Sequence, residues 1–481
     1  MTGVLEDWLA QRAFSLPDVE AVVAGDQRLT YRQLDARVRG LAGALVARGI
    51  APGDRVALLG RNSLEFVEAV HAVPRAGAIL VPLNIRLTVE ELAFQIRDAG
   101  VRMVLADRHF EATAREAAAA RAGVPDVITL PLAAAGAGAL FDTHGETDVH
   151  SIVYTSGTTG SPKGAMLTFG NFWASATSSA FNLGVLPGDR WLACMPLFHV
   201  GGLAIVLRSA IYGTSFVVHE SFDERAVADS LHSEGITTVS VVPTMLLRLL
   251  DADERPSPPA LRTVLVGGGP VPLSLLKRAM DRGFPVIQTY GLTEAASQVA
   301  TLAPGDAVAH TGSAGKPLLN TRLRIDAPPG EPGEILVAGP TVTPGYFGRP
   351  EATAAAIRDG WLHTGDVGRL DADGFLYVMD RRDDLIVSAG ENVYPAEVEA
   401  ALVAHPAVTS AAVVGLPDER WGQVVSAAIV QAAEVTDGEL EAWVRAKLAG
   451  YKVPRRFVRV AELPLTANGK IQRRLVRNLF D

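Results

Sequence analysis

The sequence contains a single cysteine, Cys194, among its 481 residues. One thiol can form neither an internal disulfide nor a cysteine-based zinc site. Because Cys194 lies in the apolar run WLACMPLF, where a thiolate is disfavoured, we expect a buried core thiol and not a nucleophile. The histidines show no HExxH pattern or other close metal pairing. A structural metal site is therefore not expected.

Long apolar runs and a basic charge balance are also missing. No run of 18 apolar residues occurs, and the start MTGVLEDWLAQ lacks the basic and apolar regions of a signal peptide. The formal net charge of -9 argues against a protein that binds a phosphate backbone. We therefore expect a cytoplasmic protein whose partners are small molecules, with no nucleic acid and no membrane span, while an oligomer stays open.

Hydrophobic and charged residues are present in the proportions of a globular protein, at 48% and 20%. A chain of 481 residues exceeds what one hydrophobic core usually supports, so at least two domains are expected. In the first 311 residues, helical patterns alternate with continuously apolar strands such as DRVALLG, TTVSVVP and LRTVLVGGG. This alternation predicts an α/β fold with helix-covered, mainly parallel sheets.

The pattern changes in the last third of the chain. Short strands with Pro and Gly turns predict a β-rich subdomain over about residues 312–382. A helix around Val398, the strands TSAAVVGL and QVVSAAIVQ and a second helix predict a small α+β domain. The charged segment before it is typical of a hinge. We predict a large N-terminal domain over 1–382 and a small, mobile C-terminal domain over 383–481.

Residues 154–164 have the sequence YTSGTTGSPKG, which follows an apolar strand. Glycines let backbone N–H groups approach phosphate oxygens, hydroxyl groups add donors, and Lys163 adds a positive charge. The segment is not a Walker A loop, because Pro162 precedes the lysine and no Ser or Thr follows it. The pattern predicts a phosphate-binding loop.

Seven segments together resemble the acyl-adenylate-forming superfamily, which includes acyl-CoA synthetases, luciferases and peptide-synthetase adenylation domains. They occur in family order and are YTSGTTGSPKG (154–164), PLFHVGG (196–202), GGGP (267–270), YGLTE (290–294), WLHTGD (361–366), DRRDDLIVSAGENVYPAEVE (380–399) and LTANGK (465–470). The resemblance runs nearly from end to end. It implies an enzyme that uses ATP, Mg²⁺ and coenzyme A.

The resemblance also implies roles for individual residues around ATP. The residues implied to bind the nucleotide are Thr155, Ser156, Gly157, Thr158, Thr159, Lys163, Gly268, Gly269, Tyr290, Thr293, Asp366 and Arg381. Among these, Tyr290 and the Gly267–Gly269 segment would flank adenine, and Asp366 would accept hydrogen bonds from the ribose. Thr155 and Glu294 are the implied magnesium ligands.

Lys470 is the predicted catalytic residue of the first step. The substrate carboxylate attacks the α-phosphate, and one ammonium between the two groups stabilises that transition state more than the ground state. No protein nucleophile or general base is needed. For the second step, in which the thiol of coenzyme A attacks the adenylate, the resemblance implies that the small domain swings about a hinge at Asp383. The loop 388–392 would then line the pantetheine tunnel, with Ala389 where the family commonly has glycine.

The acyl site is expected around His199, which matches a family position that walls or gates it. Within the superfamily, the segment 265–302 and the motif ERWGQVV most resemble the o-succinylbenzoyl-CoA synthetases of menaquinone biosynthesis. The residues expected to line the acyl pocket are His199, Gly268, Ser297, Gln298 and Thr301. Polar groups there suit a keto dicarboxylate better than a fatty acid.

Three other functions remain open from the sequence. The first is a ligase for another aryl or acyl acid. The second is a nucleotide-binding module without catalysis, but the presence of both Lys470 and Glu294 argues against it. The third is an adenylation enzyme that loads a carrier protein. Because no carrier segment follows Asp481, coenzyme A is the simpler expected acceptor. Lys452 is a candidate contact for the phosphates of coenzyme A, although we expect it to be a surface residue.

Overall fold

The computed structural model describes residues 3–119, 125–133, 139–155, 162–269, 271–381, 385–464 and 471–480. The helices within these ranges are α1 (Trp8–Ser15), α2 (Tyr31–Ala47), α3 (Leu64–Arg75), α4 (Val89–Asp98), α5 (Glu111–Ala119), α6 (Phe169–Leu183), α7 (Val200–Tyr212), α8 (Glu224–Ser233), α9 (Pro243–Ala252), α10 (Leu273–Asp281), α11 (Pro350–Ala356), α12 (Pro395–Val403), α13 (Asp437–Arg445), α14 (Arg473–Arg477) and the 3₁₀ turns η1 (Thr293–Ala295), η2 (Gly450–Lys452) and η3 (Asn478–Phe480).

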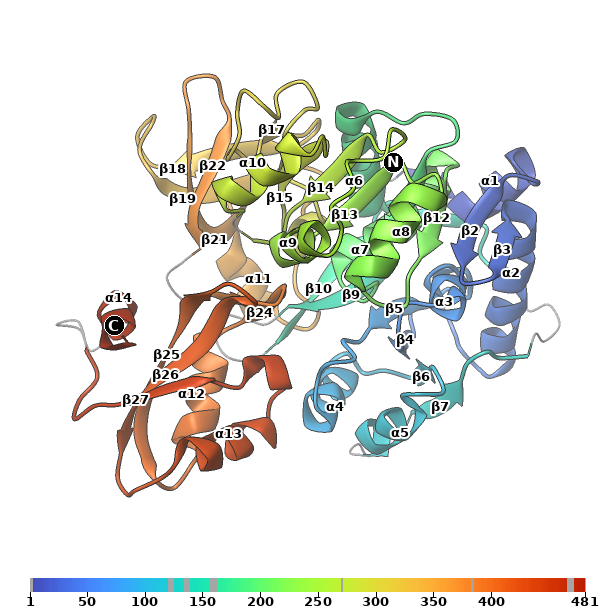
Figure 1. The fold of residues 1–481 in the computed structure, drawn as a ribbon. Coiled ribbons are helices and arrows are strands. Elements are labelled where there is room, and N and C mark those ends of the chain that lie inside the picture. Colours follow the sequence, from blue (N-terminus) through green and yellow to red (C-terminus); the bar gives the residue numbers. More distant parts are fainter. Residues whose placement is uncertain are drawn as a thin grey trace.

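Two largely parallel sheets form the body of the molecule (Figure 1). The first has the order β10 (Lys163–Thr168), β9 (Val149–Thr155), β5 (Ile79–Pro82), β4 (Arg55–Leu59), β6 (Met103–Ala106) and β7 (Asp126–Thr129). The second has the order β17 (Lys316–Pro317), β16 (Ala300–Thr301), β15 (Val286–Tyr290), β14 (Thr263–Val266), β13 (Thr238–Val241), β11 (Arg190–Ala193), β12 (Ser215–Val218), β2 (Glu20–Ala24) and β3 (Gln27–Thr30). Antiparallel pairing is confined to β10, β16, β17 and β3. A separate two-stranded ladder joins β1 (Val4–Glu6) and β8 (Thr143–Gly145).

One apolar core joins the two sheets. It contains Val56 and Leu80 of the first sheet, Val22 and Phe216 of the second, and residues of α2, α3, α6 and α7 between them. The central strands are buried along their length because helices cover both faces, which explains their continuously apolar sequences. The predicted α/β class is thereby confirmed.

The rest of the chain forms two antiparallel-rich sheets. The first contains β18 (Arg322–Asp326), β19 (Gly333–Ala338), β20 (Ile357–Arg358), β21 (Trp361–Leu370) and β22 (Leu376–Arg381). The second contains β23 (Ile386–Ser388), β24 (Glu391–Val393), β25 (Val408–Asp418), β26 (Gly422–Gln431) and β27 (Arg456–Arg459), and it has its own core with α12 and α13. We call residues 385–464 and 471–480 the C-terminal lobe, and residues 3–381 the body. Figure 1 shows this lobe in orange and red beside the body. The predicted boundary at residue 383 stays a prediction, because residues 382–384 lie outside the described ranges.

No helix in the described ranges is long and apolar enough to cross a membrane.

Cys194 is buried at the end of β11, and burial raises the pKa of its thiol to about 12. The thiol is therefore protonated at neutral pH, as the apolar sequence around it predicts. Lys452 contradicts its prediction as a surface residue. Only 2% of it is exposed, and it lies between two glutamates.

Candidate active site

A cavity of about 350 Å³ lies at the carboxyl ends of the parallel strands of the body. Pro82 ends β5, Val241 ends β13, and Gly267 follows β14, so three strands open toward the same space. Ligands commonly bind at this edge of α/β sheets, because the loops that follow the strands meet there. Ala389 and Glu391 of the C-terminal lobe close the cavity from the other side. A larger cleft of about 1850 Å³ between body and lobe shares part of this lining.

The two predicted magnesium ligands lie close together. Thr155 ends β9 and donates from Oγ1 to Oε1 of Glu294 in η1 over 3.4 Å. Their oxygen donors suit Mg²⁺, which commonly takes one or two protein groups and completes its shell with phosphate and water. The described residues contain no cluster of three or more His, Cys, Asp or Glu side chains that could hold a metal ion.

Tyr346 joins the same group, and the sequence motifs did not indicate it. Its hydroxyl donates to Oε1 of Glu294 over 2.9 Å, and Nζ of Lys163 lies 5.5 Å from the centre of its ring. Burial and the neighbouring Glu294 carboxylate raise the pKa of Tyr346, so the hydroxyl stays a donor. Lys163 is placed by the antiparallel pairing of β10 with β9, in which it faces Thr155. Ser156, Gly157, Thr158 and Thr159 lie outside the described residues.

Of the residues predicted around the nucleoside, Gly268, Thr293 and Asp366 line the cavity, and Tyr290 and Gly269 line the larger cleft. Tyr290 ends β15 and donates its hydroxyl to Oδ2 of Asp366 over 2.7 Å. Both residues are buried. In the β21–β22 ladder, Arg381 is the partner of Asp366. Gly268 has a left-handed φ of 80°, and Gly269 lies beside Val387 of the C-terminal lobe. Thr293 lines the cavity from η1.

The segment after β15 turns back on itself to bring Ser297 and Gln298 to the cavity. The turn needs glycine at position 291, because a Cβ there would lie 1.5 Å from the carbonyl oxygen of Ser297. Ala296 and Ser297 both have positive φ, at 51° and 97°. Non-glycine residues adopt this conformation rarely, and such strain concentrates at functional sites.

The predicted acyl residues divide between the cavity wall and the layer behind it. His199, Gly268, Ser297 and Gln298 line the cavity. Thr301 lies behind it in β16, where its hydroxyl accepts from Nε2 of Gln298 over 3.2 Å and contacts the Thr289 hydroxyl at 2.8 Å. Thr301 therefore orients Gln298 through a hydrogen bond, and Oε1 of Gln298 is buried without a partner among the described residues.

Arg208 is a charged lining residue that the sequence analysis missed. It lies on α7, it is 2% exposed, and burial lowers the pKa of its guanidinium. Nη2 donates to the Ser175 hydroxyl over 3.0 Å, and the guanidinium lies 6.0 Å from the Trp191 ring centre. Among the described residues, no carboxylate forms an ion pair with Arg208, and its Nε has no hydrogen-bond acceptor. A buried charge without a counter-charge is costly, which makes Arg208 a candidate anion ligand.

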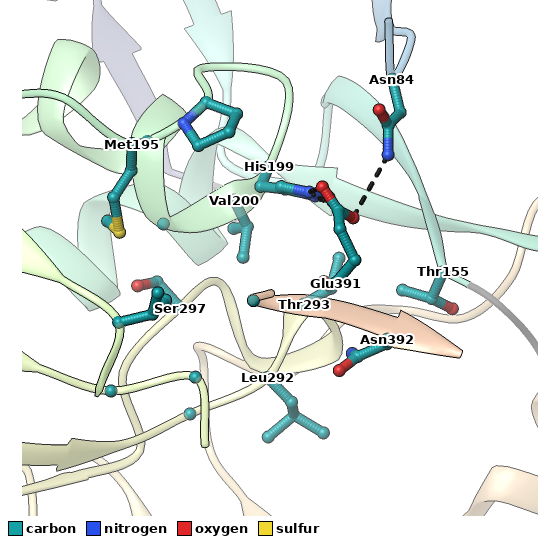
Figure 2. Close-up of a pocket in the computed structure, with 18 of the residues that line it drawn as sticks. Asn84, Thr155, Met195, His199, Val200, Leu292, Thr293, Ser297, Glu391 and Asn392 are labelled. Atoms are coloured by element: carbon teal, nitrogen blue, oxygen red, sulfur yellow. Dashed lines mark hydrogen bonds and ion pairs between the residues drawn. The ribbon is translucent and has the colours of Figure 1, made fainter. Parts of the chain in front are cut away.

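Glu391 of the C-terminal lobe reaches into the cavity toward His199, as Figure 2 shows. Oε2 of Glu391 lies 3.1 Å from Nε2 of His199. Nη1 of Arg86 donates to Oε1 of Glu391 over 2.9 Å, and Nδ2 of Asn84 donates to Oε2 over 3.3 Å. Burial favours the neutral acid, but His199 and Arg86 outweigh it and hold the pKa of Glu391 below its usual range. The carboxylate is therefore ionised, and it joins the lobe to the body.

Two further predicted residues cannot be placed. Lys470 and Asp383 lie outside the described residues, so their roles in adenylation and at the hinge stay predictions. The loop after the predicted hinge position is described. Ala389 and Gly390 connect β23 to β24, and both have positive φ, at 52° and 81°.

Two family models match the chain. That of the AMP-binding enzymes matches residues 9–347, and that of the AMP-binding enzyme C-terminal domain matches residues 397–470. The chain is 44% identical over 492 aligned positions to a protein of Bacillus cereus (strain AH820) named 2-succinylbenzoate–CoA ligase, with 100% of each chain covered.

Solved structures are similar over the whole chain. A double mutant of o-succinylbenzoate CoA synthetase from Bacillus subtilis with the product analogue OSB-NCoA has 41% identity and a TM-score of 0.95, with 99% of this chain and 98% of that chain covered. The B. subtilis enzyme with ATP and magnesium ion has 41% identity, full coverage of both chains and a TM-score of 0.76. Sequence and fold agree over the full length, and the chain therefore belongs to the family of AMP-binding enzymes.

Proposed function

We propose that this protein is an ATP-dependent acid–thiol ligase that activates 2-succinylbenzoate as an acyl adenylate and then forms its coenzyme A thioester. The name of the B. cereus relative and the ligands of the B. subtilis structures support this reaction. ATP and coenzyme A are metabolites of the cytoplasm, which is where we place the enzyme.

In the first step, a carboxylate oxygen of the acid attacks the α-phosphorus of ATP, and pyrophosphate leaves. Lys163 and the phosphate loop would bind the phosphates, Asp366 would bind the ribose, and Lys470 would act between the reacting groups. Thr155 and Glu294 would hold Mg²⁺, which supplies a positive charge that stabilises the leaving pyrophosphate. In the second step, the thiol sulfur attacks the acyl carbon and AMP leaves, after a swing of residues 383–481 about Asp383.

The proposed substrate rests above all on Arg208. The substrate has two carboxylates, of which one reacts and one stays charged. A buried guanidinium that lines the cavity without a carboxylate partner among the described residues would pair with the unreacted carboxylate. Gln298 and Ser297 would hydrogen-bond the keto and carboxylate oxygens.

The test compares 2-succinylbenzoate with 3-benzoylpropanoate and 2-butanoylbenzoate, each of which lacks one carboxylate. We expect the wild-type enzyme to prefer the diacid by roughly a hundredfold or more in kcat/KM over whichever monoacid it activates. Arg208→Leu should remove most of this preference. A fatty acid or a simple benzoic acid that outperforms the diacid would favour another acyl or aryl ligase, and transfer to a carrier protein in place of coenzyme A would favour a loading enzyme.

A further inference from the structure

A buried cluster of charges connects α4 in the body to η2 in the C-terminal lobe. Nζ of Lys452 donates to Oε1 of Glu91 over 2.6 Å and to Oε1 of Glu397 over 2.8 Å. Lys452 is 2% exposed and Glu91 is 9% exposed, so water screens the contact weakly. Glu91 belongs to the body, whereas Lys452 and Glu397 belong to the lobe.

Two further hydrogen bonds join body and lobe at the same place. The backbone N–H of Ala449 donates to Oε2 of Glu91 over 3.1 Å, and the Thr88 hydroxyl lies 3.4 Å from the carbonyl oxygen of Lys447. Each oxygen of the Glu91 carboxylate therefore accepts from a different group of the lobe. The two acceptor oxygens belong to one planar carboxylate. The contact therefore restricts the orientation of the lobe as well as its distance from the body.

Each side of this contact keeps a partner when the two sides separate. Glu91 closes the capping box of α4, where Oε2 accepts from the backbone N–H of Thr88 over 2.8 Å and from its hydroxyl over 2.9 Å. Lys452 keeps Glu397 within the lobe. Separation leaves neither a helix terminus uncapped nor the ammonium unpaired, so the contact can form and break at modest cost.

We infer that Glu91 and Lys452 are a positioning pair that holds the C-terminal lobe in the arrangement described here and thereby favours thioester formation over adenylation. The inference rests on the proposed two-step function. The arrangement described here differs more from the ATP–magnesium structure than from the OSB-NCoA structure, with TM-scores of 0.76 and 0.95. In the arrangement described here, Glu391 also contacts His199.

Glu91→Gln is the decisive variant, because glutamine still closes a capping box but carries no charge for Lys452. The matched control is Glu90→Gln, which removes an exposed charge from the same helix turn. We expect thioester formation from preformed adenylate to slow by roughly tenfold in Glu91→Gln, with ATP–pyrophosphate exchange unchanged within about twofold. Glu90→Gln should change neither rate.

A double-mutant cycle separates the pair from a general loss of structure. On a Lys452→Gln background, Glu91→Gln should reduce the rate of thioester formation little further, because the partner charge is already absent. Full additivity of the two effects would contradict the inference. An equal loss in both half reactions of Glu91→Gln, or no loss in either, would overturn it.

A conformational measurement remains valid even if the proposed substrate is wrong. Dyes at Arg97→Cys and Arg445→Cys, both exposed and on opposite sides of the contact, report the distance between body and lobe, and buried Cys194 stays unlabelled. Single-molecule energy transfer should show the compact arrangement less populated in Glu91→Gln than in the wild type. Identical distributions in the two proteins would refute the positioning role, whereas a wild-type protein inactive on 2-succinylbenzoate would refute only the substrate.

Discussion

Glu391 is the side chain through which the C-terminal lobe meets His199. Its carboxylate is ionised because His199 and Arg86 lower its pKa despite burial. A depressed pKa means that the contact stabilises the arrangement above the ordinary pKa of about 4.5 and loses strength as the pH falls below it. The Glu391 carboxylate is therefore ionised at neutral pH.

Glu391→Gln should weaken this contact while keeping the shape of the side chain. We expect thioester formation to slow by about tenfold, because a buried charge-assisted hydrogen bond becomes a neutral one. Stopped-flow mixing of preformed adenylate with coenzyme A measures this rate. Glu434→Gln, at an exposed position of the lobe, is the control. A rate equal to that of the wild type would show that the Glu391 charge is dispensable.

Single residues also show how far sequence reasoning extends. Thr155 and Glu294 were predicted as partners from motifs 139 positions apart, and the fold places them 3.4 Å apart. Arg208 and Lys452 were missed or wrongly placed, because an isolated basic residue usually lies at the surface. The roles of Arg208 and Lys452 become visible only from how deeply each side chain is buried and from which groups surround it.

At the scale of elements, the turn of the β23–β24 hairpin has a backbone conformation that the sequence alone does not predict. Ser388 pairs with Glu391, and the two residues between them both have positive φ. Turns of this kind favour glycine or asparagine, since a Cβ is strained there. Ala389 departs from the common glycine of the family but keeps the backbone that glycine would adopt.

Ala389→Gly should therefore stabilise the C-terminal lobe by about 1 kcal/mol, because it relieves the strain of the left-handed conformation. Thermal or urea denaturation measures the change. Ala442→Gly, at an exposed position inside α13, is the opposite control and should destabilise by about 1 kcal/mol. A loss of stability in Ala389→Gly would mean that the turn tolerates alanine without strain.

At the scale of the whole molecule, the two half reactions should depend on different residues of the last hundred positions. Lys470→Ala should nearly abolish adenylate formation while ATP still binds, because it removes the charge between the reacting groups. Asp383→Pro should spare adenylation and block thioester formation, because proline restricts the backbone rotation that a hinge needs. Pyrophosphate exchange and single-turnover transfer measure the two steps. An unchanged adenylation rate in Lys470→Ala would contradict the mechanism.

The body should also lose stability in mild acid through its buried histidines. Burial lowers the pKa of His150 to about 3 and that of His71 to about 4, from an ordinary 6.5. The folded state keeps both rings neutral, so their contribution is complete above pH 6.5 and decreases as the pH falls toward 4. Each histidine contributes a slope of about 1.4 kcal/mol per pH unit.

Urea denaturation at about pH 5.5 and about pH 4.5, where the unfolded histidines are protonated, measures this slope. His150→Phe should reduce the slope by one proton, since phenylalanine cannot titrate. The exposed His109→Gln should leave it unchanged. A His150→Phe slope equal to that of the wild type would show that His150 is already charged in the folded protein.

The sequence by itself determined the fold class and the family, and it predicted the phosphate loop and the two magnesium ligands, because these depend on short motifs whose residues each lie within one segment. The tertiary structure alone decided which distant charges meet. Arg208 at the cavity, Glu391 against His199, and Lys452 between Glu91 and Glu397 all depend on contacts between elements. Burial turns these ordinary charged residues into candidates for substrate binding and for control of the lobe, since the strength of a charge depends on the water and counter-charges around it.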